Sequence, residues 1–244
     1  MPPSSSPPLH PRVAIIPARG GSKRLPRKNI LPLGGRPVLA HVVGTALASG
    51  VFDRVLVSTE DSEIADVAAA AGAEVHQRPA ALADDLTGVV EVCLEVLDIL
   101  ARTGAEPAAF CCIYATAFGL RPADLQGGAR CLAEGPPDRP DGVMCVSPYN
   151  FYPHVALHRT EDGLQPFFPD LLERPRTSLP EMVASNGTFY IARTAAFRAH
   201  RTFYLPRLAA FELPAERVVD LDTPADYARA QLLYPLLSRG ATPA

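Results

Sequence analysis

The sequence contains no tryptophan, no basic excess and no long apolar run. A membrane-spanning helix needs about 18 or more apolar residues in a row. The opening dozen residues, MPPSSSPPLHPR, hold no apolar stretch of the kind found in a signal peptide. We therefore expect a cytoplasmic protein. The formal net charge of -3 argues against a nucleic-acid-binding domain, because such domains usually carry a clear basic excess.

Metal-type cysteine spacing is also missing. The five cysteines form no CxxC pair, and no histidine stands at metal-ligand spacing from them: Cys93, Cys111, Cys112, Cys131 and Cys145. We expect reduced thiols that pack as small apolar core residues. The proline- and serine-rich residues 1–11 predict a disordered tail, and the rest of the 244 residues suit a single α/β domain spanning 12–238.

Short apolar runs alternate with helical periodicity along the first 146 residues. The predicted strands are 13–16, 54–58, 73–76, 110–114 and 142–146. The predicted helices are 38–47, 64–71, 89–100 and 125–132. Such alternation predicts an α/β fold with a mostly parallel sheet and flanking helices.

The pattern breaks up between residues 147 and 207, where prolines and aromatic residues cluster. We predict a small insertion of mixed, partly antiparallel structure there. A strand over 217–221 and a helix over 223–234 are then expected to close the domain.

The segment PARGGSKRLPRKN, residues 17–29, directly follows the first predicted strand. Gly20 and Gly21 allow backbone N–H groups to approach a ligand closely. Positive charge is concentrated beside them, on Arg19, Lys23, Arg24, Arg27 and Lys28. The spacing is not that of a GxxxxGK[ST] loop or of a dinucleotide fingerprint. A polyphosphate site at the carboxyl edge of the sheet is the predicted role.

Near the other end, Asp220 and Asp222 flank Leu221 in the last predicted strand. Residues two apart on a strand share a face, so both carboxylates could bind one magnesium ion that also contacts phosphate. The alternative is that Asp222 caps the helix that follows.

Two further groups of polar residues are candidates for binding. In RPAALADDLT, Arg78 could contact a triphosphate, while Asp84, Asp85 and Thr87 could contact a base, ribose or metal; alternatively, Asp85 or Thr87 could cap a helix. In the irregular region, arginines could clamp a carboxylate and other side chains could line a sugar pocket: Arg174, Arg176, Asn186, Phe189 and Tyr190.

Four segments, IIPARGGSKRLPRKN, RPAALADDLT, NGTFYI and DLDTPADY, resemble in order and separation the acylneuraminate cytidylyltransferases, or CMP-sialic acid synthetases. The resemblance runs from about Val13 to Leu233, and CCIYAT and FDRVLVST are most similar to the pseudaminic acid branch. It implies a Rossmann-like sheet and a homodimer, with a dimerisation and sugar-site insertion within 147–207. It also implies magnesium as cofactor.

The implied reaction transfers CMP from CTP to the anomeric hydroxyl of a nonulosonic acid and releases pyrophosphate. By motif position, the implied catalytic residues are Arg19, Lys23 and Asp222, and the implied metal ligands are Asp220 and Asp222. The nucleotide-binding set is Ala18, Arg19, Gly20, Gly21, Ser22, Lys23, Asn29, Arg78, Asp85 and Thr87. The sugar-binding set is Tyr114, Thr116, Arg176, Asn186 and Tyr190.

The chain departs from the sialic acid pattern where Tyr114 stands in place of a glutamine, whereas Asn186, Gly187 and Tyr190 resemble the sialic and legionaminic branches. The acceptor therefore stays open between pseudaminic, legionaminic and sialic acids. The alternatives are a nucleotidyltransferase for another keto-sugar acid, such as an octulosonate, and a non-catalytic sugar-nucleotide-binding protein.

Overall fold

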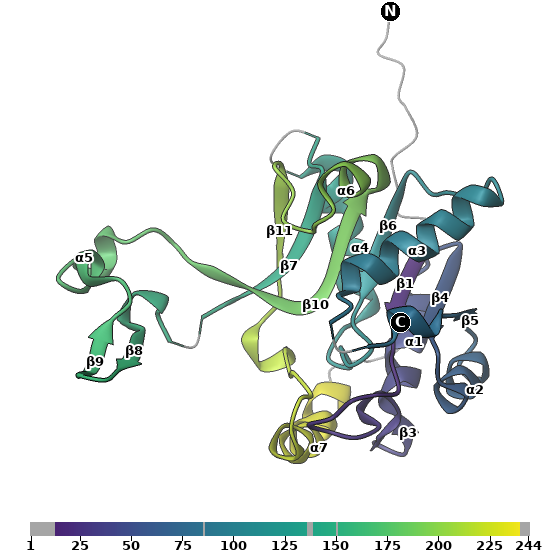
Figure 1. Ribbon diagram of the computed structural model, residues 1–244, viewed down its shortest axis with the longest axis horizontal. Coiled ribbons are helices and arrows are strands. Elements are labelled where there is room, and N and C mark those ends of the chain that lie inside the picture. Colours follow the sequence, from purple (N-terminus) through teal and green to yellow (C-terminus); the bar gives the residue numbers. More distant parts are fainter. Residues whose placement is uncertain (1–12, 85, 136–138, 150, 240–244) are drawn as a thin grey trace, which may run out of the picture.

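The computed structural model describes residues 13–84, 86–135, 139–149 and 151–239. The predicted tail, 1–11, lies outside them. Within the described residues the centre is a seven-stranded sheet of order β11-β7-β10-β6-β1-β4-β5 (Figure 1). Its strands are β1 (Val13–Pro17), β4 (Arg54–Thr59), β5 (Glu74–Gln77), β6 (Ala109–Ile113), β7 (Gly142–Pro148), β10 (Val183–Arg193) and β11 (Leu208–Glu212).

The sheet is mostly parallel, as predicted. β1 pairs in parallel with β4 and β6, β5 pairs in parallel with β4, and β11 pairs in parallel with β7. Only β10 among these strands runs antiparallel, between β6 and β7. The middle strands are buried on both faces, which explains their unbroken apolar sequences.

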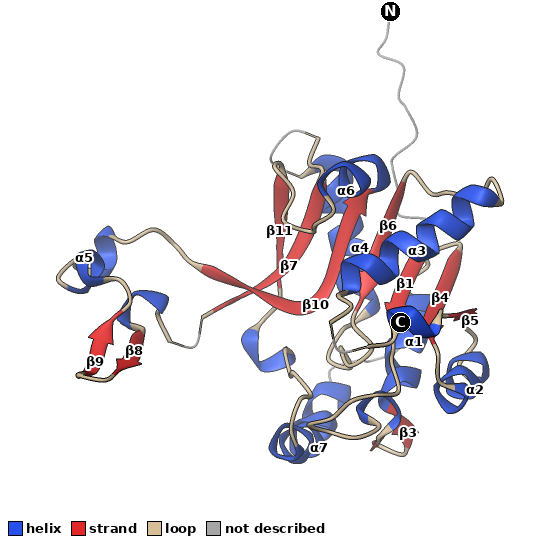
Figure 2. Cartoon of the chain, in the orientation of Figure 1, coloured by secondary structure: helices blue, strands red, loops and turns tan. Residues whose placement is uncertain are grey.

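Helices cover both faces of the sheet (Figure 2). α1 (Val38–Ala48), α2 (Ser62–Ala70) and α4 (Pro122–Glu134) contribute to the apolar core on one face, and α3 (Val89–Arg102) and α6 (Thr194–His200) to the core on the other. α7 (Pro224–Arg239) packs on a third, smaller core beside the short hairpin of β2 (Pro32–Leu33) and β3 (Arg36–Pro37).

A separate arm projects away from the sheet between β7 and β10 (Figure 1). It carries the hairpin of β8 (Leu157–Thr160) and β9 (Gly163–Pro166), followed by the short helix α5 (Pro169–Leu172). Large apolar side chains lie exposed along it, including Phe151, Leu157, Leu164 and Phe167. The predicted irregular region thus contains this arm, but its later part forms β10 and α6 of the main body.

The strand predicted over 217–221 is wrong. These residues form the end of a 3-10 turn, Ala215–Arg217, and an extended segment without a strand partner. The strand beside β7 is instead β11. Val218 and Val219 have high strand propensity, but propensity without an available sheet edge does not make a strand.

All five cysteines are free thiols; Cys131 is half-buried and the other four are buried. The prediction of reduced core thiols is therefore confirmed for those four. Among the described residues no helix combines the length and apolar character that crossing a membrane requires.

Asp61 links the start of α2 to residues 17–29, which are rich in glycine and basic side chains and form the basic loop. Its Oδ1 accepts a hydrogen bond of 3.0 Å from Ile64 N, and its carboxylate pairs with Arg27, which lowers the Asp61 pKa. Arg27 itself has a left-handed backbone, with φ of 59°. The pair therefore joins a helix N-cap to a strained turn of the loop.

We predict that Asp61→Ala lowers the free energy of unfolding by about 1–2 kcal/mol at pH 7, measured by urea denaturation. Because the folded pKa of Asp61 is depressed, its contribution is fully present above its unfolded pKa of about 3.9 and is lost as pH falls through the lower folded value. The difference in unfolding free energy between the wild type and Asp61→Ala should therefore shrink in acid. Asp61→Asn retains a capping acceptor, so a loss as large as that of the alanine variant would contradict this account.

Candidate active site

The basic loop between β1 and η1 (Lys28–Ile30) is held by buried polar contacts at both ends. Ala18 N donates to Ser58 O at 2.9 Å, and the buried Asn29 donates from Nδ2 to Arg19 O at 2.9 Å. Ala18 is itself only 1% exposed, so it positions the loop rather than contacting a ligand directly. The intervening basic side chains are consequently presented from a fixed backbone.

The two glycines of the loop have different surroundings. Gly20 N donates to Glu60 Oε1 at 2.7 Å, and a Cβ atom at Gly20 would overlap the Asp61 carboxylate. Gly21 is exposed, and a Cβ atom there would meet nothing within 4 Å. Close packing therefore requires glycine at the first position only.

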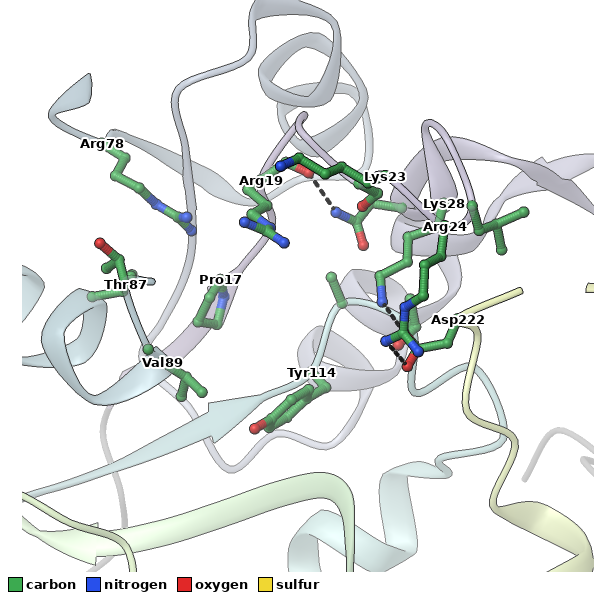
Figure 3. Close-up of a pocket in the computed structure, with 17 residues that line it drawn as sticks. Pro17, Arg19, Lys23, Arg24, Lys28, Arg78, Thr87, Val89, Tyr114 and Asp222 are labelled. Carbon is green, nitrogen blue, oxygen red and sulfur yellow. Dashed lines mark hydrogen bonds and ion pairs between the residues drawn. The ribbon is translucent and has the colours of Figure 1, made fainter. Parts of the chain in front are cut away.

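A cavity of about 210 Å³ lies against this loop (Figure 3). Of the predicted nucleotide and sugar residues, those that line it are Arg19, Ser22, Lys23, Asn29, Arg78, Thr87, Tyr114 and Thr116. Asp222, from the far end of the chain, lines it as well. The structure thus brings the basic loop and one of the two aspartates to the same cavity.

Asp222 is neutralised by two cations of the loop. Lys28 Nζ donates to Asp222 Oδ1 at 2.9 Å, and Arg24 Nη2 donates to Oδ2, as the dashed lines of Figure 3 show. The hydrogen bond from Lys28, together with the charges of both cations, holds the pKa of Asp222 below its ordinary value. Asp222 is therefore an ionised carboxylate on the cavity wall.

The alternative in which Asp222 caps the last helix does not hold. Asp226 Oδ2 accepts from Thr223 N at 2.8 Å, and Asp226 N donates back to Thr223 Oγ1 at 3.3 Å. This reciprocal pair is a capping box at the start of α7. The cap is formed one residue later than expected, which leaves the Asp222 side chain directed to the loop.

Asp220 lines a second cavity, of about 380 Å³. Partial burial, followed by the nearby charge of Asp222, raises its pKa. Tyr114 and Thr116 line both cavities, so the two spaces share a wall. The two carboxylates are close enough to affect each other, although they do not share one face of a strand as predicted.

Four of the predicted sugar residues line the second cavity, since Asn186 and Tyr190 lie there with Tyr114 and Thr116. Ser185 Oγ and Tyr190 OH are hydrogen-bonded at 2.8 Å, and the rings of Tyr114 and Tyr190 meet edge to face at 5.9 Å between centroids. Burial raises the pKa of both phenols. At neutral pH both are therefore un-ionised hydrogen-bonding groups, unsuited to accept a proton as a base.

Arg78 is almost completely buried. Its Nη2 donates to Ser58 O at 2.6 Å, and Glu60 lies 3.9 Å from its Nη1. Burial lowers the pKa of the guanidinium, but from so high a value that it stays charged. Arg78 therefore supplies a fixed positive charge to the first cavity.

The segment that follows Arg78 closes one side of that cavity. Asp84 Oδ1 accepts from Thr87 N and from Thr87 Oγ1, both at 2.7 Å, and Asp84 O accepts from Arg19 Nη1 at 2.9 Å. Asp85 lies outside the described residues. The helix α3 begins after Gly88, which forms no side-chain cap, so Thr87 is not its cap.

Other predicted residues are elsewhere. Phe189 is fully buried in the core because strand alternation turns it to the face opposite Tyr190. Arg174 is exposed on the arm and lines neither cavity, and Arg176 has its backbone in the arm's turn Arg176–Ser178, with its side chain outside the described part.

Sequence reasoning missed several polar residues of the second cavity, among them Ser185, Tyr204 and Arg217. Arg217 stands three residues before Asp220, inside the segment assigned to a strand. No local motif distinguishes it, because its importance depends on packing against α4.

Comparison with known proteins agrees with this geometry. The profile of the cytidylyltransferase family matches residues 13–139. The pseudaminic acid cytidylyltransferase of Campylobacter jejuni subsp. jejuni serotype O:2 is 30% identical over 91% of this chain and 95% of its own length. N-acylneuraminate cytidylyltransferase B of Danio rerio is 33% identical over 90% of this chain and 50% of its own length.

Solved structures support the fold. A CMP:2-keto-3-deoxy-manno-octonic acid synthetase complexed with CTP aligns with a TM-score of 0.65 at 19% identity, covering 92% of this chain and 98% of its own. A 4-diphosphocytidyl-2C-methyl-D-erythritol synthase also gives 0.65, at 18% identity, over 92% of this chain and 99% of its own. Since the family profile spans more than half of the sequence and a relative matches nearly all of it, this chain belongs to the cytidylyltransferase family.

Proposed function

We propose that this protein transfers CMP from CTP to the anomeric hydroxyl of a nonulosonic acid of the pseudaminic, legionaminic or sialic type, with release of pyrophosphate. One observation carries the proposal. The cavity that holds the basic loop and Asp222 shares a wall with the cavity that holds Asp220 and the tyrosines. A nucleotide in the first space and a sugar in the second would meet at that wall.

The basic residues of the first cavity suit the triphosphate of CTP. Arg19, Lys23 and Arg78 line this cavity and provide positive charge. Nucleotidyl transfer depends chiefly on positioning and on neutralising the charge that develops on the leaving group. Cations presented by the basic loop and by Arg78 after β5 would do both.

The aspartate pair suits magnesium, although among the described residues no group of three or more histidine, cysteine or acidic side chains gathers as a metal cage. Two neighbouring carboxylates, Asp220 and Asp222, fit an ion that takes one or two protein carboxylates and completes its shell with phosphate and water. When bound, Mg²⁺ would neutralise phosphate charge and lower the pKa of a hydroxyl. Lys28 and Arg24, which neutralise Asp222, line the same cavity and would contact the phosphates that fill it.

The second cavity suits the sugar. Thr116, Asn186 and Tyr190 offer hydrogen-bonding groups to its hydroxyls and amides, and Tyr114 lines the wall that the two cavities share. No protein general base is assigned, since the phenols are held neutral. Attack by the sugar hydroxyl on the α-phosphorus would therefore depend on alignment and on the cations around it.

The homodimer is also part of the proposal, with the segment 147–207 supplying the dimerisation arm of a domain that spans 12–238. The exposed apolar side chains of the arm support it, because a monomer seldom leaves such a patch uncovered. In the dimer Arg174 and Arg176 of one arm would complete the sugar site of the partner. A cytoplasmic location remains a prediction.

The direct test is pyrophosphate release with Mg²⁺, crossing four nucleoside triphosphates with pseudaminic, legionaminic, sialic and octulosonic acids. We expect release with CTP and one or more nonulosonic acids. Turnover with the octulosonic acid alone would favour the other keto-sugar acid, and CTP binding without turnover with any acid would favour a non-catalytic protein.

Asp222→Asn is predicted to lower the rate of release by about 10²–10³-fold, because an anionic ligand of the magnesium ion that would neutralise the phosphates is lost. Asp98→Asn removes an exposed carboxylate that pairs with Arg198 on α6 and serves as the matched control. Equal rates for Asp222→Asn and the wild type would contradict a metal role for this residue.

The two glycines provide a second test. Gly20→Ala should weaken CTP binding by about tenfold or more, because the new methyl group displaces the Asp61 carboxylate and shifts the loop. Gly21→Ala meets no atom and should bind CTP within about twofold of wild type. Isothermal titration with CTP measures both; weakened binding in Gly21→Ala alone would refute the packing argument.

The arm is tested by oligomeric state. Leu164→Asp combined with Phe151→Asp should convert a dimer to a monomer in light-scattering chromatography, because both apolar side chains would be covered in the interface. Leu232→Asp, on an exposed face of α7, is the control and should leave the mass unchanged. A wild-type monomer would exclude the proposed dimer.

A further inference from the structure

We propose that Arg217 binds the carboxylate of the acceptor sugar acid and so determines the preference for acidic sugars. This inference rests on the proposed function and adds a residue to it. Among the described residues that line the second cavity, Arg217 is the only positively charged one and Asp220 is the only acidic one. A sugar acid in this space has one cationic side chain of this chain to pair with.

The chemistry of the acceptor places its carboxylate near the reaction. In a 2-keto sugar acid, the carbon that carries the attacking anomeric hydroxyl also carries the carboxylate. Both groups must therefore lie together where the second cavity meets the nucleotide cavity. Arg217 precedes Asp220 by three residues and lines the same space.

The hydrogen-bonding state of Arg217 leaves donors for a ligand. Its side chain is 12% exposed, and Nη2 donates to the equally buried Asp124. Its Nε has no hydrogen-bond partner but is closed to solvent, so a carboxylate in the cavity would pair with the terminal guanidinium nitrogens, of which Nη2 also pairs with Asp124. A guanidinium offers five N–H donors in a planar fork that matches a carboxylate. A buried unpaired donor is costly, and a bound anion nearby would reduce that cost.

The surrounding contacts hold Arg217 in place. Asp124 Oδ2, its ion-pair partner, also accepts from Arg121 N at 2.7 Å at the start of α4. On the backbone side, Arg217 O lies so near Gly119 that a Cβ atom there would overlap it. An arginine fixed in this way binds a carboxylate with little loss of side-chain freedom.

The test compares the kinetics of Arg217→Gln, Arg217→Lys and the double variant Arg217→Gln/Asp124→Asn in pyrophosphate release. We expect KM for the sugar acid to rise about 10- to 100-fold in Arg217→Gln, with KM for CTP within about twofold of wild type. Arg217→Lys should recover part of the loss. Arg207→Gln, which removes an exposed arginine paired with Asp141, is the control and should behave as wild type.

The double variant separates binding from structure, because it replaces the buried ion pair by two neutral amides. We expect its KM for the sugar acid to stay high; recovery would mean that the single variant suffers only from an unpaired Asp124. With an acceptor that carries a carboxamide in place of the carboxylate, KM for the acceptor should differ far less between the wild type and Arg217→Gln than it does with the acid.

Unchanged KM in Arg217→Gln, or an equal rise for CTP and sugar, would overturn the assignment while leaving the proposed function intact. A wild-type enzyme that releases no pyrophosphate with any sugar acid would instead overturn the proposed function and this inference together.

Discussion

The ion pair between Lys28 and Asp222 joins two segments that are 194 residues apart in the chain. Arg24 adds a second link to the same carboxylate. Nearby, Tyr227 of α7 donates to Pro32 O, and apolar residues of α7 pack around Leu33. These contacts fix the C-terminal segment against the basic loop. Without them the loop would be a cluster of repelling cations and the aspartates would have no defined position.

The parallel core of the fold could be read from the sequence because its strands are buried on both sides. Runs such as VAIIP and AFCCI have no polar alternation, and helices of 3.6-residue period separate them. The C-terminal part was harder. β11, with the sequence LAAFE, carries few strand-forming residues, and its pairing with β7 is set by tertiary packing. Val218 and Val219 gave the stronger local signal in the wrong place.

At the candidate site, the sequence motifs predicted part of the set of residues that line the two cavities, but not how these residues pair. The glycine and basic pattern located the loop, yet the choice of Asp222 as partner for Lys28 depends on the three-dimensional fold. The helix cap was misplaced by one residue because Asp222 and Thr223 are both good capping residues, and only Asp226 settles the choice. Arg217 had no signal of its own, since its partner Asp124 lies on a distant helix.

The position of the arm has an evolutionary consequence. It leaves the sheet after Pro148 and returns at Val183, and these two residues are paired neighbours on adjacent strands. Because the exit and the return are held side by side, the arm can lengthen, shorten or be exchanged without any strand of the body changing register. The length and surface of the arm can thus diverge between relatives while the seven-stranded sheet keeps its pairing.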